Sequence, residues 1–158
     1  MDLQQLFSAR DVVVDFSPAD KWEAIRLLVE HLAATGRLAE DRVEDVLEAV
    51  ISRERSMSTG MENGIAIPHA AVDEITEAVG AIGLLPDPGL PFDSADGQNA
   101  RVVVALVIPR AQKLLHIRTI GAVARMFSRP EVREKVLAST TREEAFESMV
   151  AADEAGAS

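Results

Sequence analysis

One short segment of the sequence gathers the residue types that could handle a phosphoryl group. His69 ends a short apolar run, and Arg53 supplies a fixed positive charge upstream of it. Between them stand hydroxyl side chains and flexible glycines, at Ser58, Thr59, Gly60 and Gly64. A neutral imidazole can attack phosphorus near pH 7, because its unperturbed pKa is about 6.5. Arginine and N–H donors bind the phosphoryl oxygens. The segment therefore indicates phosphoryl transfer with His69 as the nucleophile.

The chain has three histidines, and their contexts differ. His31 lies beside the apolar stripe of a predicted helix, where a surface position is the simpler interpretation. His116 shares a helical face with Ile120, Val123 and Phe127, so a core histidine with a satisfied hydrogen bond and a second site histidine both stay open.

Two other kinds of chemistry find little support. The loop before His69 does not contain the Gly-x4-Gly-Lys-Ser/Thr pattern of a nucleotide-binding P-loop. A catalytic zinc site needs three protein ligands, and the chain has neither a cysteine nor a His-Glu-x-x-His motif. Metal-dependent hydrolysis through His69 and His116 is thus the weakest alternative, and we expect no metal and no cofactor.

Composition narrows the class of protein further. The 158 residues include 16 Lys and Arg against 26 Asp and Glu, a formal charge of −10, which disfavours nucleic-acid and anionic-membrane partners. The longest apolar stretch has seven residues, 102–108, where a membrane helix needs about 20. The first five residues, 1–5, have no signal-peptide character, so a cytoplasmic location is expected.

The elements that must position these residues alternate between strands and helices. Ser17, followed by Pro18, predicts the start of one helix, which Gly36 closes, and Asp41 with Glu44 predicts a capped second helix to about Arg55. Strands are predicted at 12–16, 65–70, 79–85 and 100–108, and further helices at 113–128, 130–137 and 142–151. We expect one α/β domain, residues 1–152, with a central mixed sheet flanked by helices, and a short flexible tail, 153–158.

The segment from Arg53 to His69 also resembles a known signature. Its sequence, RERSMSTGMENGIAIPH, is similar to that of the mannitol/fructose-type (type 2) enzyme IIA domains of the bacterial phosphoenolpyruvate-dependent phosphotransferase system. Residues 91–98 resemble the family's loop before the central strand, and residues 107–109, followed by His116, resemble the segment with its second histidine. Residues 126–128 and 131–133 are most similar to the nitrogen-regulatory branch, the PtsN or enzyme IIA(Ntr) proteins. The resemblance spans about residues 5–150.

This resemblance implies the mannitol-type IIA fold and a role for each residue of the segment. His69 would be phosphorylated by an HPr/NPr-like phosphocarrier protein, His116 would contact the phosphoryl oxygens, and Arg53 matches the family's active-site arginine. The phosphoryl pocket would be lined by Ser58, Thr59, Gly60 and Gly64. The downstream partner would be a regulatory target protein or a sugar permease.

One residue departs from the family pattern. Glu62 stands where the family usually has a glycine. If that position needed a positive φ, glutamate would be strained there, and its carboxylate could repel a phosphoryl group. Three readings therefore stay open: a regulatory phosphocarrier, a sugar-specific IIA component, and a binding module that has lost phosphotransfer.

Overall fold

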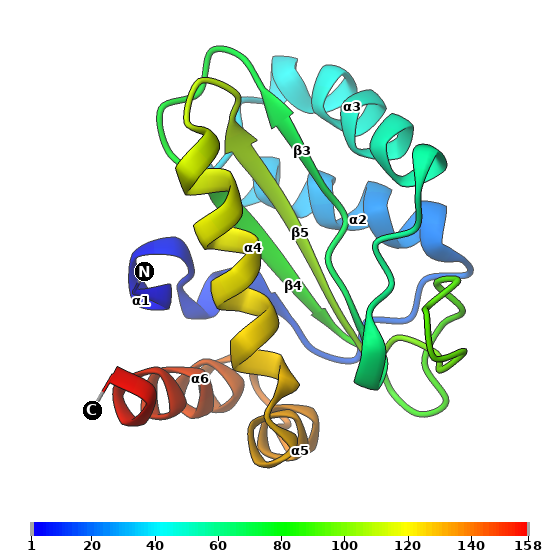
Figure 1. Cartoon of the computed structure of the whole chain (residues 1–158), viewed down its shortest axis with the longest axis vertical. Coiled ribbons are helices and arrows are strands. Elements are labelled where there is room, and N and C mark those ends of the chain that lie inside the picture. The colour runs from blue at the N-terminus through cyan, green and yellow to red at the C-terminus, as the bar shows by residue number, and fades with distance from the viewer. Residues whose placement is uncertain (1, 158) are drawn as a thin grey trace.

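A five-stranded mixed sheet forms the centre of the computed structural model, which describes residues 2–157 (Figure 1). Its strands pair in the order β1-β4-β5-β2, and β3 also pairs with β5. Only β4 and β5 are antiparallel among the described pairs. The strands are β1 (Val12–Val13), β2 (Ile65–Ala66), β3 (His69–Val72), β4 (Val79–Leu84) and β5 (Val102–Pro109). The expected α/β fold with a mixed sheet is confirmed.

Strand β5 lies inside the sheet, where it pairs with β2, β3 and β4. All eight of its residues are buried, because helices cover both faces of the sheet and no side of the strand meets water. Its side chains alternate between the two cores: Val102, Val104, Leu106 and Ile108 enter one, and Val103, Ala105 and Val107 enter the other.

The two faces of the sheet carry different helices (Figure 1). Helices α2 (Lys21–Ala34) and α3 (Val43–Ser56) pack on one face. The other face is covered by α1 (Leu3–Leu6), α4 (Lys113–Ser128), α5 (Pro130–Ala138) and α6 (Arg142–Ala157). Single turns of 3-10 helix lie at Ala9–Asp11, Glu40–Arg42 and Glu62–Gly64. Across residues 2–157, no helix has the length and apolar character needed to cross a bilayer.

The predicted N-terminal caps of the first two long helices are wrong. Helix α2 begins at Lys21, and its cap is Asp20, whose side chain accepts from the backbone N–H of Glu23 at 2.8 Å, so Ser17 is not the cap. Helix α3 follows directly on the preceding 3-10 turn, in which the Glu40 carbonyl accepts the N–H of Val43. It therefore has no side-chain cap, and the predicted Asp41–Glu44 pair does not form one.

The end of the chain is more regular than expected. Helix α6 is capped by the Thr141 hydroxyl, which accepts from the N–H of Glu144 at 3.1 Å. The helix does not stop near residue 151 but continues to Ala157, because Ala152 packs into the core and Asp153 accepts the backbone N–H of Leu3 at 3.0 Å. The tail expected at 153–158 is therefore helical to Ala157, and Ser158 lies outside the described residues.

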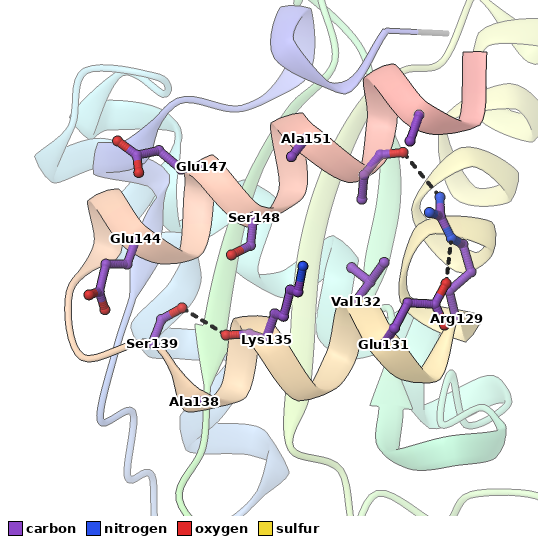
Figure 2. Close-up of a pocket in the computed structure, with 12 residues that line it drawn as sticks. Arg129, Glu131, Val132, Lys135, Ala138, Ser139, Glu144, Glu147, Ser148 and Ala151 are labelled. Atoms are coloured by element: carbon purple, nitrogen blue, oxygen red, sulfur yellow. Dashed lines mark hydrogen bonds and ion pairs between the residues drawn. The ribbon is translucent and has the colours of Figure 1, made fainter. Parts of the chain in front are cut away.

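A groove of about 620 Å³ separates α5 from α6 (Figure 2). It exists because small side chains, among them Ala151 and Ser148, face α5 where larger ones would fill the space. Arg129 bridges the pair by donating to the carbonyl of Ala152 at 3.1 Å. The groove belongs to this helix pair, whereas the residues singled out for phosphoryl chemistry lie on α3, β3, α4 and the loop after α3.

Candidate functional site

The topology of the sheet brings two distant histidines together. His69 opens β3, opposite Leu106 of β5 in a parallel pair, and is only 8% exposed. His116 lies in the first turn of α4, the helix that follows β5. The two ring centroids are 5.3 Å apart and the rings are nearly perpendicular, at 86°. Residues separated by 47 positions in the sequence therefore share one site.

A backbone contact decides which nitrogen of His69 can act as a nucleophile. Nδ1 lies 2.8 Å from the carbonyl oxygen of Ile67. A carbonyl only accepts hydrogen bonds, so Nδ1 must carry the proton and donate it. In the neutral ring, Nε2 then has no proton and presents its lone pair.

The surroundings of His69 also keep the ring neutral. Burial is the largest cause, and it lowers the pKa of His69 below its ordinary value of 6.5. The hydrogen bond to Ile67 opposes this shift, while the electrostatic interactions of the ring with Arg53 and His116 add to it. The neutral, nucleophilic form therefore persists below pH 6.5.

Imidazole NMR across a pH series tests both the tautomer and the lowered pKa of His69. We expect Nδ1 of His69 to carry the proton, Nε2 to show the shift of an unprotonated nitrogen, and the ring to titrate below 6.5. In Arg53→Gln the pKa should rise, because a positive charge that opposes protonation is gone. It should still stay below 6.5, because burial remains. A proton on Nε2 in the wild type would contradict the proposed nucleophile.

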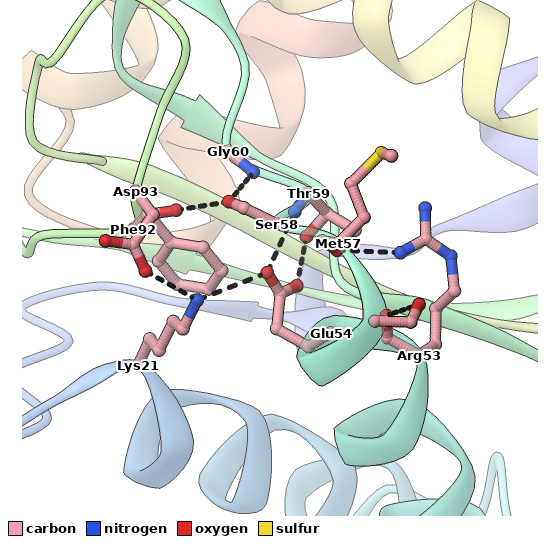
Figure 3. A network of polar contacts seen from close by, with 10 residues as sticks. Lys21, Arg53, Glu54, Met57, Ser58, Thr59, Gly60, Phe92 and Asp93 are labelled. Atoms are coloured by element: carbon pink, nitrogen blue, oxygen red, sulfur yellow. Dashed lines mark hydrogen bonds and ion pairs between the residues drawn. The ribbon is translucent and has the colours of Figure 1, made fainter.

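The loop between α3 and β2 is held by a buried carboxylate that the sequence analysis missed (Figure 3). Glu54 is 2% exposed, and it accepts from both the backbone N–H and the hydroxyl of Thr59, the former at 2.8 Å. Lys21 of α2 lies 3.5 Å from the same carboxylate and 3.0 Å from that of Asp93. Glu54 thus connects α2, α3 and two loops through charge-assisted contacts.

A sequence signal for Glu54 exists in hindsight. It extends the apolar stripe of α3, one turn after Val50, where a charged residue must face the core. Acidic side chains are almost never fully buried unless they are paired. An acid at an apolar position of the stripe therefore indicates a buried polar network.

The other predicted pocket residues shape the same loop. The Ser58 hydroxyl donates to the carbonyl of Phe92 and accepts from the N–H of Gly60 at 3.0 Å. A side chain at Gly60 would collide with that carbonyl, since a Cβ there would lie 2.6 Å from it. Gly64 adopts a φ of 77°, which favours glycine. These residues fix the path of the loop that leads to β2, and β3 with His69 follows.

Arg53 stands at the junction of α3 and this loop. It is half-buried, and its Nη1 donates to the carbonyl of Met57 at 2.8 Å (Figure 3). That bond folds the guanidinium over the start of the loop. Its charge is close enough to His69 to contribute to the lowered pKa of that ring.

Glu62 is not strained. The positive φ angles of this turn fall on Asn63, at 67°, and Gly64, so the backbone of Glu62 is ordinary. Asparagine tolerates the left-handed region better than most residues. The Glu62 side chain is exposed and lines a hollow of about 310 Å³ with Met61 and Arg125. The expected strain at the family's glycine position is therefore absent from Glu62.

Substitutions at two neighbouring positions test this assignment. Asn63→Ala should destabilise the protein by about 1 kcal/mol relative to Asn63→Gly, because alanine is disfavoured at a φ of 67°. Glu62→Ala should change stability by less than about 0.5 kcal/mol. Urea unfolding of the three variants measures these changes in stability. A larger loss of stability in Glu62→Ala than in Asn63→Ala would contradict the assignment of the left-handed conformation to Asn63.

Fold and site together define a small α/β protein with a buried, neutral histidine paired with a second histidine. A sequence model of the family described as "Phosphoenolpyruvate-dependent sugar phosphotransferase system, EIIA 2" matches residues 5–151, and the chain belongs to this family. It is a IIA-type component of the phosphotransferase system, as the resemblance implied.

Relatives of at least two kinds match the chain by sequence. The chain is 37% identical over 103 residues to the "Nitrogen regulatory protein" of Klebsiella oxytoca, an alignment that covers 65% of this chain and 63% of that protein. It is 28% identical over 142 residues to the "PTS system fructose-specific EIIA component" of Haloferax volcanii, which covers 90% of each.

Solved structures show the same fold. The nitrogen regulatory protein IIA-Ntr of Neisseria meningitidis superposes with a TM-score of 0.82 at 24% identity, covering 93% of this chain and 98% of that one. The IIA mannitol protein of Escherichia coli gives a TM-score of 0.75 at 24% identity, covering 90% and 98%. The expected mannitol-type IIA fold is confirmed.

Proposed function

We propose that this chain is a histidine phosphocarrier and that Nε2 of His69 accepts a phosphoryl group from an HPr/NPr-like carrier protein. The observation that supports this most is the bond from Nδ1 to the Ile67 carbonyl, because it leaves Nε2 with a free lone pair. As the bond from Nε2 to phosphorus forms, the nitrogen–phosphorus bond of the carrier's phosphohistidine breaks. The carrier's imidazole keeps that electron pair, and no proton has to leave His69.

Two neighbouring side chains have a role in the same step. The transferred group carries negative charge on its oxygens, and donors already in place stabilise such charge without reorganisation. His116, with its ring 5.3 Å from that of His69, and Arg53 are the side chains that we assign to these oxygens. Ser58, Thr59, Gly60 and Gly64 maintain the loop.

A regulatory role is our first choice for the phosphorylated protein. Its support is the 37% identity to the Klebsiella nitrogen regulatory protein. A sugar-specific IIA component is the second candidate, since the fructose-specific relative aligns over 90% of the chain. Transfer of the phosphoryl group from His69 to a sugar-specific IIB domain would support the second, and a phosphorylation-dependent regulatory target would support the first.

The third reading, a binding module without phosphotransfer, rested on Glu62. Its ordinary backbone and exposed side chain remove the strain argument. Equal partner binding by wild type, His69→Ala and His69→Asp would revive this reading.

Reconstitution tests the proposal. The protein is incubated with phosphoenolpyruvate, the general phosphotransfer enzyme and the carrier, and acid-labile phosphate is followed by ³¹P NMR. We expect one phosphohistidine per chain, linked through Nε2. Absence of label, or label on another residue, would refute the assignment to His69.

A further inference from the structure

Half-buried arginines of this chain fall into two groups, those with a carboxylate partner and those without one. The first group forms ion pairs with acidic side chains and consists of Arg37, Arg42 and Arg129. The second group forms no ion pair within residues 2–157 and consists of Arg53, Arg101 and Arg133. A partly desolvated charge gains most from a partner of opposite sign, so the second group offers positions for an anion.

Arg101 and Arg133 are each held by one hydrogen bond to the main chain, as Arg53 is. Nε of Arg101 donates to the carbonyl of Leu85 at 3.1 Å, and Nη1 of Arg133 donates to the carbonyl of Phe127 at 2.8 Å. A guanidinium has more N–H groups than one carbonyl can accept. Each side chain is therefore fixed in place while most of its donors and its charge stay available.

The two arginines line the same hollow, which has a volume of about 370 Å³. Arg101 immediately precedes β5, and α5 contributes one of its faces, formed by Pro130, Arg133, Glu134 and Leu137. The groove between α5 and α6 takes Glu131 and Lys135 from the neighbouring face of α5, and Ala138 borders both spaces. The hollow is thus distinct from the groove of Figure 2.

The position of Arg101 is fixed by two loops, at a distance from the histidine pair. Its backbone N–H donates to the carbonyl of Gly64 at 2.8 Å, and a Cβ at Gly89 would lie 2.9 Å from its Cγ. Leu106, the partner of His69 in the sheet, follows five residues later, which is roughly 16 Å along an extended strand. The hollow therefore lies toward the opposite end of β5 from His69.

The acidic side chains around the hollow leave it with a positive charge. Glu134 lines the hollow, but it is exposed and forms no ion pair in the part of the chain that the structure describes. Glu131 pairs with Arg129 at 3.4 Å on the neighbouring face of α5. The acids of the loops around Arg101 do not line the hollow; they are Glu62, Asp87 and Asp96. Two guanidinium groups therefore face one carboxylate in a chain whose formal charge is −10.

We propose that this hollow, the Arg101–Arg133 site, binds the phosphate group of a small organic phosphate. A guanidinium presents planar pairs of N–H donors that match phosphate oxygens, and two such groups suit a doubly charged phosphate. Pro130 and Leu137 provide an apolar wall for the carbon skeleton. The volume of about 370 Å³ lies at the small end of the range for ligand pockets, so the ligand has few carbon atoms. This inference does not depend on phosphorylation of His69.

Titration calorimetry with glycerol phosphate tests the site. The wild type should bind with a Kd below about 1 mM. Arg133→Gln should weaken binding at least about tenfold, because it removes charge-assisted donors, and Arg133→Lys should lie between the two, since it keeps the charge but loses the planar pair of donors. Thermal melting of each variant establishes that it is folded.

Two further variants on the same helix serve as controls. Lys135→Gln removes the same charge as Arg133→Gln, but from the neighbouring face of α5, and should bind within about twofold of the wild type. Glu134→Gln should bind about twofold more tightly or better, because the carboxylate that repels the phosphate is gone. Equal binding by the wild type, Arg133→Gln and Lys135→Gln would overturn the site, as would a wild-type Kd above about 1 mM.

Other probes identify which part of the ligand is recognised. Glycerol phosphate should bind more tightly than inorganic phosphate, and glycerol should give no binding heat. Inorganic phosphate that binds equally well would overturn the assignment to an organic phosphate, and succinate that binds more tightly would overturn the assignment to a phosphate. Loss of binding in Arg53→Gln but not in Arg133→Gln would place the probe at the histidine pair and would also overturn the proposal.

Discussion

His69→Ala is expected to abolish phosphorylation completely, and His116→Ala to slow it about 100-fold. The first substitution removes the only atom that forms the bond to phosphorus in the proposed step. The second removes one group that stabilises charge on the phosphoryl oxygens, a loss that costs roughly 100- to 1,000-fold at preorganised sites. The measurement is the rate at which the phosphorylated carrier loses its label to each variant.

The chain provides its own control for this pair. His31 is a histidine on α2 whose Nε2 lies 2.7 Å from the Arg10 carbonyl, and α2 covers the face of the sheet opposite to α4. His31→Ala should transfer at the wild-type rate. Should His116→Ala also transfer at that rate, the ring contact at 5.3 Å has no role in the step. Residual acid-labile label in His69→Ala would show that another residue accepts the phosphoryl group.

Glu54→Ala is expected to cost about 3 kcal/mol of unfolding free energy, a fall of roughly 8 °C in Tm. The substitution leaves the buried N–H and hydroxyl of Thr59 without their acceptor and takes away the carboxylate that faces Lys21. Removing one partner of a buried charged network is strongly destabilising. The loss is moderated because Lys21 keeps its contact with Asp93.

Calorimetric melting measures this effect, and phosphotransfer should slow about tenfold because the loop beside His69 loses its anchor. Glu48→Ala removes an exposed acid from the same helix and should change stability by less than about 0.5 kcal/mol. Glu54→Gln should lie between the two, since an amide can accept from Thr59 but does not neutralise Lys21. Equal melting of Glu54→Ala and Glu48→Ala would mean that the buried network does not hold the loop.

Elements with a long, uninterrupted pattern could be predicted closely from the sequence. Helix α4 begins and ends at the predicted residues, because its apolar face and the following Arg129-Pro130 leave little choice. The strand predicted at 65–70 is instead two short strands. Pro68 has no N–H to donate, so the ladder with β5 is interrupted there and resumes at His69. This interruption also decides where His69 stands in the sheet.

The candidate site was predictable in its residue types but not in its contacts. His69, His116 and Arg53 are distinguished by their chemistry and by the family resemblance. The apolar stripe of α3 marks Glu54 as a buried acid, but no local pattern identifies its partner Lys21, which lies 33 positions away. The backbone conformation of Glu62 could not be predicted for a similar reason. The turn as a whole decides which residue adopts the positive φ, and that residue is its neighbour Asn63.

The parallel pairing of β3 with β5 affects when, during synthesis, the chain forms the buried site around His69. His69 leaves the ribosome well before its partner strand, Val102–Pro109, and before His116. The burial that keeps its ring neutral depends on contacts made by these later residues, and their pairing must close a long loop. A nascent or truncated chain that ends before β5 would present an unpaired, hydrated histidine. Phosphorylation of His69 would then report that the polypeptide has been completed through β5 and has folded.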